Sequence, residues 1–288
     1  MIRETFYALD DLYQRYVYER PSGPFRKALV REVARQDFLP AAHRLCRDGM
    51  LLLPGYFQGE TLRGMQEDFS RWAPAVPPDE IGRITLTERK GYRLRDSSTL
   101  SSAAVDPFLL ALVAYYWGKP IYLSMTLGFR LEPSPRGRNA GPFQWHHDAN
   151  RKQIKIYLLL TPVGSEGQRL DYIPGTHTLW HRFPRGSSGY SETRIPDEIA
   201  LRHGEPVRCA GPAGTAIIMD TNGIHTGNQN MSARRDAWVF QYTAGRHIEP
   251  LAGLHPDVYT RLTPLHRMIL RPRNLAPAGQ SLPQLSPL

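Results

Sequence analysis

Two potential metal-binding side chains lie close together in the segment FQWHHDANRK, which spans residues 143–152. On an extended segment, side chains alternate between two faces, so His146 and Asp148 point the same way and His147 points away. An imidazole and a carboxylate on one face can reach a single metal ion. Two ligands do not make a metal site, so a third must come from elsewhere in the chain.

Among the other histidines, His225 is the best candidate for that third ligand. It follows an apolar stretch, lies in the turn-like sequence DTNGIHTGN, and is 79 residues beyond His146. Two imidazoles and one carboxylate with open coordination positions form the facial triad of non-haem Fe(II) oxygenases. Any one such histidine is more often an ordinary core or surface residue. The prediction of an iron site therefore rests on the combination with Asp148.

A pair of arginines follows His225 and suits the same chemistry. Arg234 and Arg235 open the segment RRDAWVFQYTAG. A guanidinium makes two parallel hydrogen bonds to a carboxylate, so it could hold the far end of a dicarboxylate that chelates iron. Because neighbours on a strand face opposite ways, only one of the two can point inward. The alternative is that both are surface charges.

Several short motifs together resemble the phytanoyl-CoA dioxygenase family. They are WHHD at 145–148, IPGTH at 173–177, HTGNQN at 225–230 and RDA at 235–237. The stretch RDGMLLLPGYFQGETL also resembles the opening element of that family, and the resemblance extends over about residues 38–245.

This resemblance implies a fold, a set of cofactors and a role for particular residues. The implied fold is a double-stranded β-helix, or jelly roll, and the cofactors are Fe(II) and 2-oxoglutarate, with O2 as the oxidant. His146, Asp148 and His225 would ligate iron, and Arg235 rather than Arg234 would hold the distal carboxylate of 2-oxoglutarate. Halogenating relatives have a small residue in place of the carboxylate. Asp148 therefore implies hydroxylation, desaturation or another oxidation, with succinate and CO2 as co-products.

Five further residues are weaker candidates. Tyr157 and Thr161 would share one face of a strand and could touch the co-substrate, although ordinary barrel-lining residues would look the same. Arg130 precedes the His146 segment and could bind an acidic group of the substrate. Lys155 and Arg93 are possible substrate contacts, with solvated surface charge as the alternative for both.

The elements that must position these residues follow from hydrophobic periodicity. Helices are expected within 1–35, from residue 38, from about residue 59 and over 106–117, and a short apolar strand over 50–53. The pattern becomes strand-like from residue 121, with further strand segments at 154–163, 214–228 and 234–245. Residues 74–105 and 178–206 have the composition of loops, and we expect them at the mouth of the site.

Short strands separated by Gly- and Pro-rich turns predict a mostly β protein with flanking helices. The expected architecture is a double-sheet jelly roll, cupin-like, with helical elements packed on it. We expect one domain over residues 1–270, with N-terminal helices in 1–117 and a β core in 121–245. The Pro-rich tail at 271–288 is expected to be disordered or loosely draped.

Composition limits the classes of function. Two cysteines exclude a cysteine-rich zinc module or a disulfide framework. No run approaches the ~20 apolar residues of a membrane span, and the N-terminus lacks an apolar signal core, so we expect a cytoplasmic protein without a membrane partner. The net charge of +9 suits a substrate or carrier with phosphate or carboxylate groups. Basic residues do not cluster on one element, so no nucleic-acid partner is expected.

The expected substrate is a small molecule, with a biosynthetic role favoured. An acyl-CoA or carrier-tethered substrate is the main alternative, followed by an oxygenase acting on nucleic acid or protein. A further alternative is a non-catalytic jelly-roll binding protein, which would retain the same metal-binding residues but catalyse no reaction. A zinc hydrolase is also conceivable, because two histidines and a carboxylate can hold zinc with a bound water.

Overall fold

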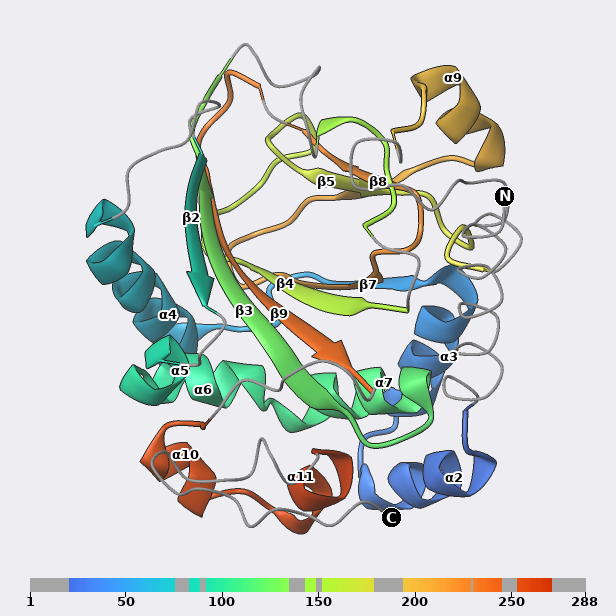
Figure 1. Cartoon of the computed structure of the whole chain (residues 1–288), viewed down its shortest axis with the longest axis vertical. Helices are drawn as coiled ribbons and strands as arrows, with labels where there is room; N and C mark the ends of the chain where they lie inside the picture. The colour runs from blue at the N-terminus through green and yellow to red at the C-terminus, as the bar shows by residue number, and fades with distance from the viewer. Residues whose placement is uncertain are drawn as a thin grey trace, which may run out of the picture.

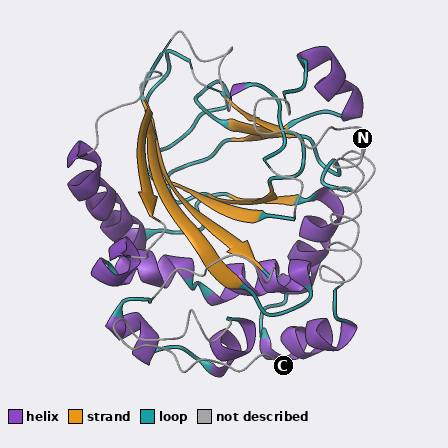
Figure 2. Ribbon diagram, in the orientation of Figure 1, coloured by secondary structure: helices purple, strands orange, loops and turns teal. Residues whose placement is uncertain are grey.

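The structure of the protein, a computed structural model, describes residues 21–75, 83–88, 92–134, 143–148, 152–178, 194–228, 230–244 and 253–270. These residues form two antiparallel β-sheets, and most of the helices lie along one face of the larger sheet (Figures 1 and 2). The predicted mixture of β-sheet and flanking helices is confirmed at this level.

The larger sheet has six strands. Their order is β1 (Met50–Leu53), β7 (Ala216–Asp220), β4 (Ile154–Leu159), β9 (Arg235–Thr243), β3 (Tyr122–Leu131) and β2 (Arg83–Glu88). The smaller sheet has the order β6 (Val207–Cys209), β5 (Leu170–Tyr172) and β8 (His225–Gly227). Neighbouring strands are far apart in the sequence, so each sheet is built from non-local pairings.

The two faces of the larger sheet have different partners. On β4 and β9 the even-numbered residues, such as Ile156 and Trp238, pack into the core that the helices share. The odd-numbered residues, such as Tyr157 and Val239, belong to a second cluster that includes Leu170 of the smaller sheet. This second face is called the inner face below. Because strand side chains alternate, parity along β4 and β9 decides which side chains can reach the space between the sheets.

The helices cover the opposite face. They are α2 (Gly23–Glu32), α3 (Phe38–Asp48), α4 (Gly59–Trp72), α5 (Tyr92–Asp96), α6 (Ser98–Ala104), α7 (Pro107–Trp117), α10 (Pro256–Thr260) and α11 (Pro264–Ile269). A short helix, α9 (Asp197–Ala200), and two 3-10 turns, η2 (Ala73–Ala75) and η4 (Leu201–His203), complete the described helical elements.

Helix α7 is the central helix of this layer. The Asp106 carboxylate accepts hydrogen bonds from the backbone N–H groups of Phe108 and Leu109, which caps the N-terminus. Gly118 ends the helix with a φ of 67°, a left-handed conformation that glycine adopts without strain. The stretch Ser98–Trp117 is long and apolar enough to cross a membrane, but 72% of its most apolar window is buried inside the molecule. It therefore behaves as part of the core.

Most elements expected from the sequence are present, with two errors. The strand at 50–53 and the helices beginning at residues 38, 59 and 107 are confirmed. The expectation of loops throughout 74–105 was wrong, because β2, α5 and α6 lie there. The polar side chains that suggested a loop are used internally. Ser97 caps α6 and contacts Asp68, and the Ser101 hydroxyl donates to the Leu94 carbonyl.

Three expectations fall wholly or partly outside the described residues. The helical stretch expected in 1–35 is described only from residue 21, where α2 is present. In the segment 178–206, residues 179–193 lie outside the description, and the remainder carries α9 and η4. The tail 271–288 is also outside it.

Candidate metal centre

Three side chains predicted from the sequence converge on one point. Asp148 Oδ1 lies 3.5 Å from His146 Nε2 and 3.7 Å from His225 Nε2. One potential ligand atom from each residue lies within 4.8 Å of the others, a spacing that one metal ion can bridge. The two histidines are 4% and 3% exposed, so the site is well shielded from solvent.

Backbone pairing explains why the two histidines meet. His146 and His225 are direct partners in an isolated antiparallel bridge, with their ring centroids 4.2 Å apart. Directly opposite residues in an antiparallel pair project their side chains to the same face. The Asp148 N–H donates to the Thr221 carbonyl at 3.0 Å, which ties the third ligand to the same turn. The His146 segment is thus held by bridges, not by the longer strand that the sequence suggested.

Hydrogen bonds also set the orientation of both imidazole rings. His146 Nδ1 lies 2.7 Å from the Gln144 carbonyl oxygen, and His225 Nδ1 lies 3.0 Å from the Gly223 carbonyl oxygen. A carbonyl only accepts, so each Nδ1 carries the proton and each Nε2 presents a lone pair toward Asp148. Metal-binding histidines are commonly fixed in this way.

The charges of the three groups are those that a metal requires. Burial, followed by the neighbouring His146, lowers the pKa of His225 to about 3, which keeps this imidazole neutral. Burial acts to raise the pKa of Asp148, but the Lys155 ammonium group holds it well below the ordinary value. Neutral nitrogen donors and one carboxylate, with no further protein ligand among the described residues, fit a divalent ion that keeps open positions.

Arg235 supplies a buried cation on the inner face of the larger sheet. Its guanidinium is 4% exposed, donates from Nη1 to the Gln168 carbonyl at 2.5 Å, and lies over the Phe129 ring at 5.1 Å. No carboxylate of the described residues pairs with it, and its Nε lacks an acceptor among them. Burial lowers the pKa of Arg235 to about 10, so it stays charged at neutral pH. A buried cation with unused donors fits an anionic ligand.

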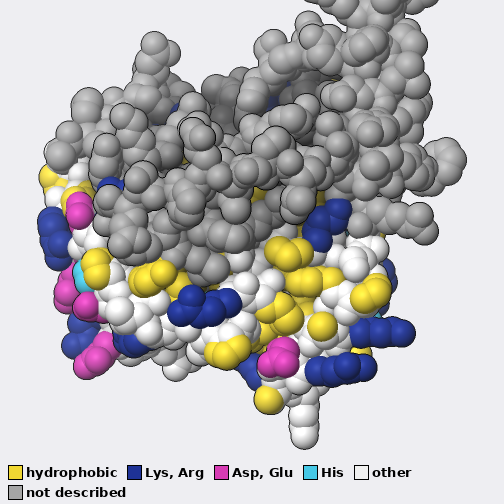
Figure 3. All heavy atoms as spheres, turned by 60° about the horizontal axis from the view of Figure 1, so that its bottom comes forward, with side chains coloured by type: hydrophobic (Ala, Val, Ile, Leu, Met, Phe, Trp, Pro, Cys, Tyr) yellow, Lys and Arg dark blue, Asp and Glu magenta, His cyan; other side chains and the backbone are white. Residues whose placement is uncertain are grey.

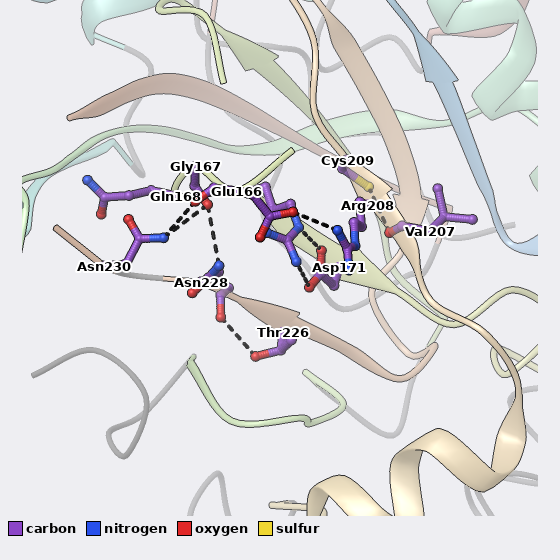
Figure 4. A network of polar contacts seen from close by, with 12 residues as sticks. Glu166, Gly167, Gln168, Asp171, Val207, Arg208, Cys209, Thr226, Asn228 and Asn230 are labelled. Atoms are coloured by element: carbon purple, nitrogen blue, oxygen red, sulfur yellow. Dashed lines mark hydrogen bonds and ion pairs between the residues drawn. The ribbon is translucent and has the colours of Figure 1, made fainter. Parts of the chain in front are cut away.

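The carbonyl that receives Arg235 belongs to a well-fixed loop. The Gln168 side chain donates to the carbonyls of Leu131 and Ala233 at 3.2 and 3.1 Å. The two chain neighbours of Gln168 are held as well. Asn228 Nδ2 donates to the Gly167 carbonyl at 3.3 Å (Figure 4). Arg169 forms an ion pair with Asp171. These contacts set the position from which the Arg235 side chain is held.

The structure separates the two adjacent arginines as strand alternation requires. Arg234 is 52% exposed and lies 3.7 Å from Asp236, whereas Arg235 points inward. Thr161 braces the strand at this point: its hydroxyl accepts from the Asp236 N–H at 3.1 Å and donates to the Arg234 carbonyl at 3.4 Å. Thr161 therefore positions the backbone on both sides of Arg235. Tyr157 lies on the inner face of β4 and is 9% exposed.

The three residues expected at the substrate have different outcomes. Arg130 faces the helices, where it makes a two-pronged ion pair with Asp236 at 2.8 Å, so the expectation of a substrate contact does not fit its position. Its neighbour Phe129 occupies the inner face instead. Lys155 does reach the site, but its Nζ lies 2.5 Å from Asp148 Oδ2. Arg93 lies in α5, and its side chain is outside the described part.

Two groups that contact Arg235 were not predicted from the sequence. Phe129 faces the Arg235 guanidinium, and the Gln168 backbone accepts from it. An aromatic residue in the alternating pattern of β3 could have been singled out, but only with the register of the strands known. A backbone carbonyl leaves no trace in the sequence.

Comparison with known proteins adds a family and a fold. The family model described as "Phytanoyl-CoA dioxygenase (PhyH)" matches residues 45–237. The ectoine dioxygenase of Bordetella bronchiseptica is 25% identical over 244 residues, which are 73% of this chain and 77% of that protein. The L-proline trans-4-hydroxylase of Streptomyces griseoviridis is 25% identical over 227 residues, 68% of this chain and 82% of that one.

Solved structures show the same fold. The non-heme alpha-ketoglutarate-dependent epimerase SnoN from nogalamycin biosynthesis superposes with a TM-score of 0.56 at 18% identity, covering 83% of this chain and 89% of that one. EctD from S. alaskensis with bound Fe gives a TM-score of 0.54 at 21% identity, covering 76% and 79%. The family match spans the triad up to His225 and Arg235, so the chain belongs to the phytanoyl-CoA dioxygenase (PhyH) family and is an iron- and 2-oxoglutarate-dependent oxygenase.

Proposed function

We propose that the protein hydroxylates an unactivated C–H bond of a small-molecule substrate, with succinate and CO2 as co-products. The observation that carries this proposal is Arg235, a buried cation without a carboxylate partner among the described residues, on the inner face of the larger sheet, from which Lys155 also reaches Asp148. A hydrolytic metal site does not need such a cation to activate its bound water. A dicarboxylate co-substrate that chelates iron at one end needs one at its other end.

Each side chain has a distinct task in this proposal. His146, Asp148 and His225 hold the metal, and Arg235 binds and orients the distal carboxylate of 2-oxoglutarate. Iron with its co-substrate supplies the activation of dioxygen that C–H hydroxylation requires. The inner-face residues Tyr157 and Phe129 exclude water from the space between Arg235 and the metal ligands, which strengthens the Arg235–carboxylate attraction.

The two sheets support a jelly-roll arrangement of the core. We infer that β1, β7, β4, β9, β3 and β2 form one layer of a double-stranded β-helix and that β6, β5 and β8 belong to the other. The helices around α7 cover the outer face of the larger layer (Figure 1). One domain over residues 1–270, acting in the cytoplasm, remains our proposal for the organisation and location of the protein.

The size of the substrate is suggested by the relatives. The curated relatives are named for ectoine and for L-proline, and we propose a substrate of the same small class here. Among the described residues on the face shown in Figure 3, Lys and Arg side chains are scattered among acidic and hydrophobic ones and do not form one patch. This distribution supports a small molecule over a nucleic acid, which would need a basic surface along its backbone.

The decisive experiment measures co-substrate binding before any substrate is known. Anaerobic, Fe(II)-loaded protein is titrated with 2-oxoglutarate, and the visible charge-transfer absorption of the chelate and the heat of binding are recorded. Saturable binding is expected for wild type and for Arg234→Ala, which removes an exposed arginine from the adjacent position. His225→Ala and Arg235→Ala should lose binding or weaken it strongly.

Three results would count against the proposal. If wild type binds no 2-oxoglutarate, the oxygenase function fails. If Arg234→Ala weakens binding and Arg235→Ala does not, the co-substrate lies elsewhere. Failure to release succinate in air, across small-molecule, acyl-CoA and carrier-bound candidates, would instead indicate a binding protein that retains the ligands.

A further inference from the structure

We propose that Lys155 is a positioning residue that fixes how Asp148 binds the metal, and that it does not contact the substrate. The proposal rests on the iron and 2-oxoglutarate chemistry proposed above. Its basis is the distribution of contacts around the Asp148 carboxylate, whose two oxygens face different partners.

The carboxylate is divided between the metal site and the lysine. Oδ1 lies 3.5 and 3.7 Å from the two Nε2 atoms that converge on the site. Oδ2 accepts a hydrogen bond from Lys155 Nζ at 2.5 Å. The side chains of Asp148 and Lys155 are 10% and 12% exposed, so water competes weakly with this contact. A charged hydrogen bond in a shielded site is strong enough to hold one carboxylate orientation.

The strand register directs Lys155 to this oxygen. On β4, Lys155 stands directly across from Met219 of β7 on one side and from Gln241 of β9 on the other. Met219 belongs to the inner-face cluster, and the parity of β4 places Lys155 on that same face. The Lys155 ammonium group therefore extends into the space where Asp148 lies.

The consequence concerns the number of positions that Asp148 occupies on the metal. A free carboxylate can bind a metal with one oxygen or with both. With Oδ2 engaged by Lys155, only Oδ1 is available, so Asp148 takes a single position. Three protein ligands would then leave room on the metal for 2-oxoglutarate and dioxygen to bind. Without Lys155, the second oxygen would compete for this room.

Lys152 offers a matched control on the same stretch of chain. Its Nζ donates to the Tyr116 carbonyl at 3.2 Å and lies over the rings of Tyr116 and Trp117 at 4.0 and 5.0 Å. It carries the same charge as Lys155 and lies three residues away, but these contacts are to the helical layer. Removing it changes the net charge equally and leaves the Asp148–Lys155 contact in place.

The test compares Lys155→Met with Lys152→Met. Mn(II) binding is measured by calorimetry, and 2-oxoglutarate binding to anaerobic Fe(II)-loaded protein is measured by the charge-transfer absorption. Removing partners that orient metal ligands typically costs roughly 10- to 100-fold in affinity. We expect a loss of this size in 2-oxoglutarate affinity for Lys155→Met, with an altered charge-transfer band. Lys152→Met should match wild type.

Two further variants keep the test decisive. Lys155→Arg and Lys155→Gln each keep a donor for Oδ2 and should recover most of the affinity. If Lys155→Met does not fold, Lys155→Ala, which also lacks a donor, takes its place. A comparable loss of Mn(II) affinity supports the same role, because Asp148 is then no longer held in a ligating orientation. If Lys155→Met binds Mn(II) and 2-oxoglutarate as wild type does, the positioning role is refuted. If wild type itself binds no 2-oxoglutarate, it is the proposed function that fails.

Discussion

His146 and His225 exchange both of their backbone hydrogen bonds, at 2.9 and 3.1 Å, although 79 residues separate them in the sequence. Because the two residues are paired directly, their rings lie on the same side of the chain with centroids 4.2 Å apart. The geometry of the two nitrogen ligands is thus set by the backbone itself, before any metal binds. A metal centre built in this way needs little rearrangement on loading.

The first prediction concerns the stability that the metal contributes. A ligand that binds only the folded state adds about 2.7 kcal/mol when its free concentration is 100 times its Kd. At such a concentration of Mn(II) or anaerobic Fe(II), the free energy of unfolding of the wild-type protein, measured by thermal or urea unfolding, should rise by this amount. His225→Ala should gain almost nothing at the same metal concentration, because one of three ligands is gone.

His147 provides the control for this comparison. It is adjacent to His146, but its Nδ1 contacts the Asn222 carbonyl and it takes no part in the triad. His147→Ala should therefore keep the metal-dependent increment even if its metal-free stability falls. An equal increment in His225→Ala and wild type would show that the metal binds elsewhere.

The second prediction is that Arg235 lowers the stability of the protein that has no co-substrate bound. A buried guanidinium without a carboxylate partner carries a desolvation penalty, and replacing buried charge by an apolar side chain is often neutral or stabilising. Arg235→Met should leave the free energy of unfolding unchanged or raise it, while 2-oxoglutarate binding is lost. Urea unfolding without 2-oxoglutarate measures the first effect. A strong destabilisation would mean that the Gln168 and Phe129 contacts make Arg235 a structural residue.

The third prediction assigns Arg130 to the scaffold. Arg130 and Asp236 form a two-pronged ion pair with side chains 13% and 7% exposed, on the face that packs against the helices. Removing one partner leaves the other charged and shielded, so Arg130→Met should cost on the order of 3 kcal/mol in the free energy of unfolding. The affinity of the folded fraction for 2-oxoglutarate should not change.

A second substitution separates pairing from packing at this position. The double variant Arg130→Met and Asp236→Leu removes both charged groups. No unpaired charge then remains buried, so part of the lost stability should return. Denaturant unfolding of the two single variants and the double variant gives the coupling energy directly. Unchanged stability together with a raised KM for the substrate, once it is known, would instead restore Arg130 to the substrate site.

The fourth prediction is the pH dependence of the metal-free protein. Burial lowers the pKa of His225 to about 3, whereas a histidine in an unfolded chain titrates near ~6.5. At pH values between these two pKa values, the unfolded state binds more protons than the folded state. The free energy of unfolding is therefore highest above the unfolded-state pKa and decreases as pH falls through this window. The unfolding free energy should therefore drop between about pH 7 and about pH 5.

His225→Gln should show a shallower drop over the same range, because the group that titrates is gone. Some slope should remain, since burial also lowers the pKa of His266. Thermal unfolding of chelator-treated protein in a series of buffers measures both slopes. Identical slopes in the two proteins would show that His225 is not the titrating group.

The convergence of His146, Asp148 and His225 could be predicted from the sequence because it depends largely on local chemistry. Alternation along an extended segment was enough to separate His146 and Asp148 from His147, and the same rule limited the choice between Arg234 and Arg235 to one inward residue. The continuously apolar elements β1 and α7 were also predicted. Their runs of hydrophobic residues report directly on burial, which in α7 includes every residue from Phe108 to Trp117.

Other features depend on how separate elements meet. Arg130 was assigned to the site, but its face on β3 is decided by the pairing of Arg130 with Asp236 across two strands. The polar stretch before α7 folds into β2, α5 and α6 because partners such as Asp68 satisfy its hydroxyl groups. The Lys155–Asp148 contact joins two segments whose approach no local pattern encodes.

The ligand segment is attached to the rest of the protein differently from the strands beside it. Trp145 and His146 make isolated bridges to Ile195 and His225, while β4 and β7 share a continuous ladder. Local opening requires breaking few contacts in the first case and many in the second. We therefore expect the amide protons of the ligand segment to exchange with solvent well before those of the large sheet when metal is absent. Such a division would let the protein take up and release its metal through a small local fluctuation, with the scaffold remaining folded throughout.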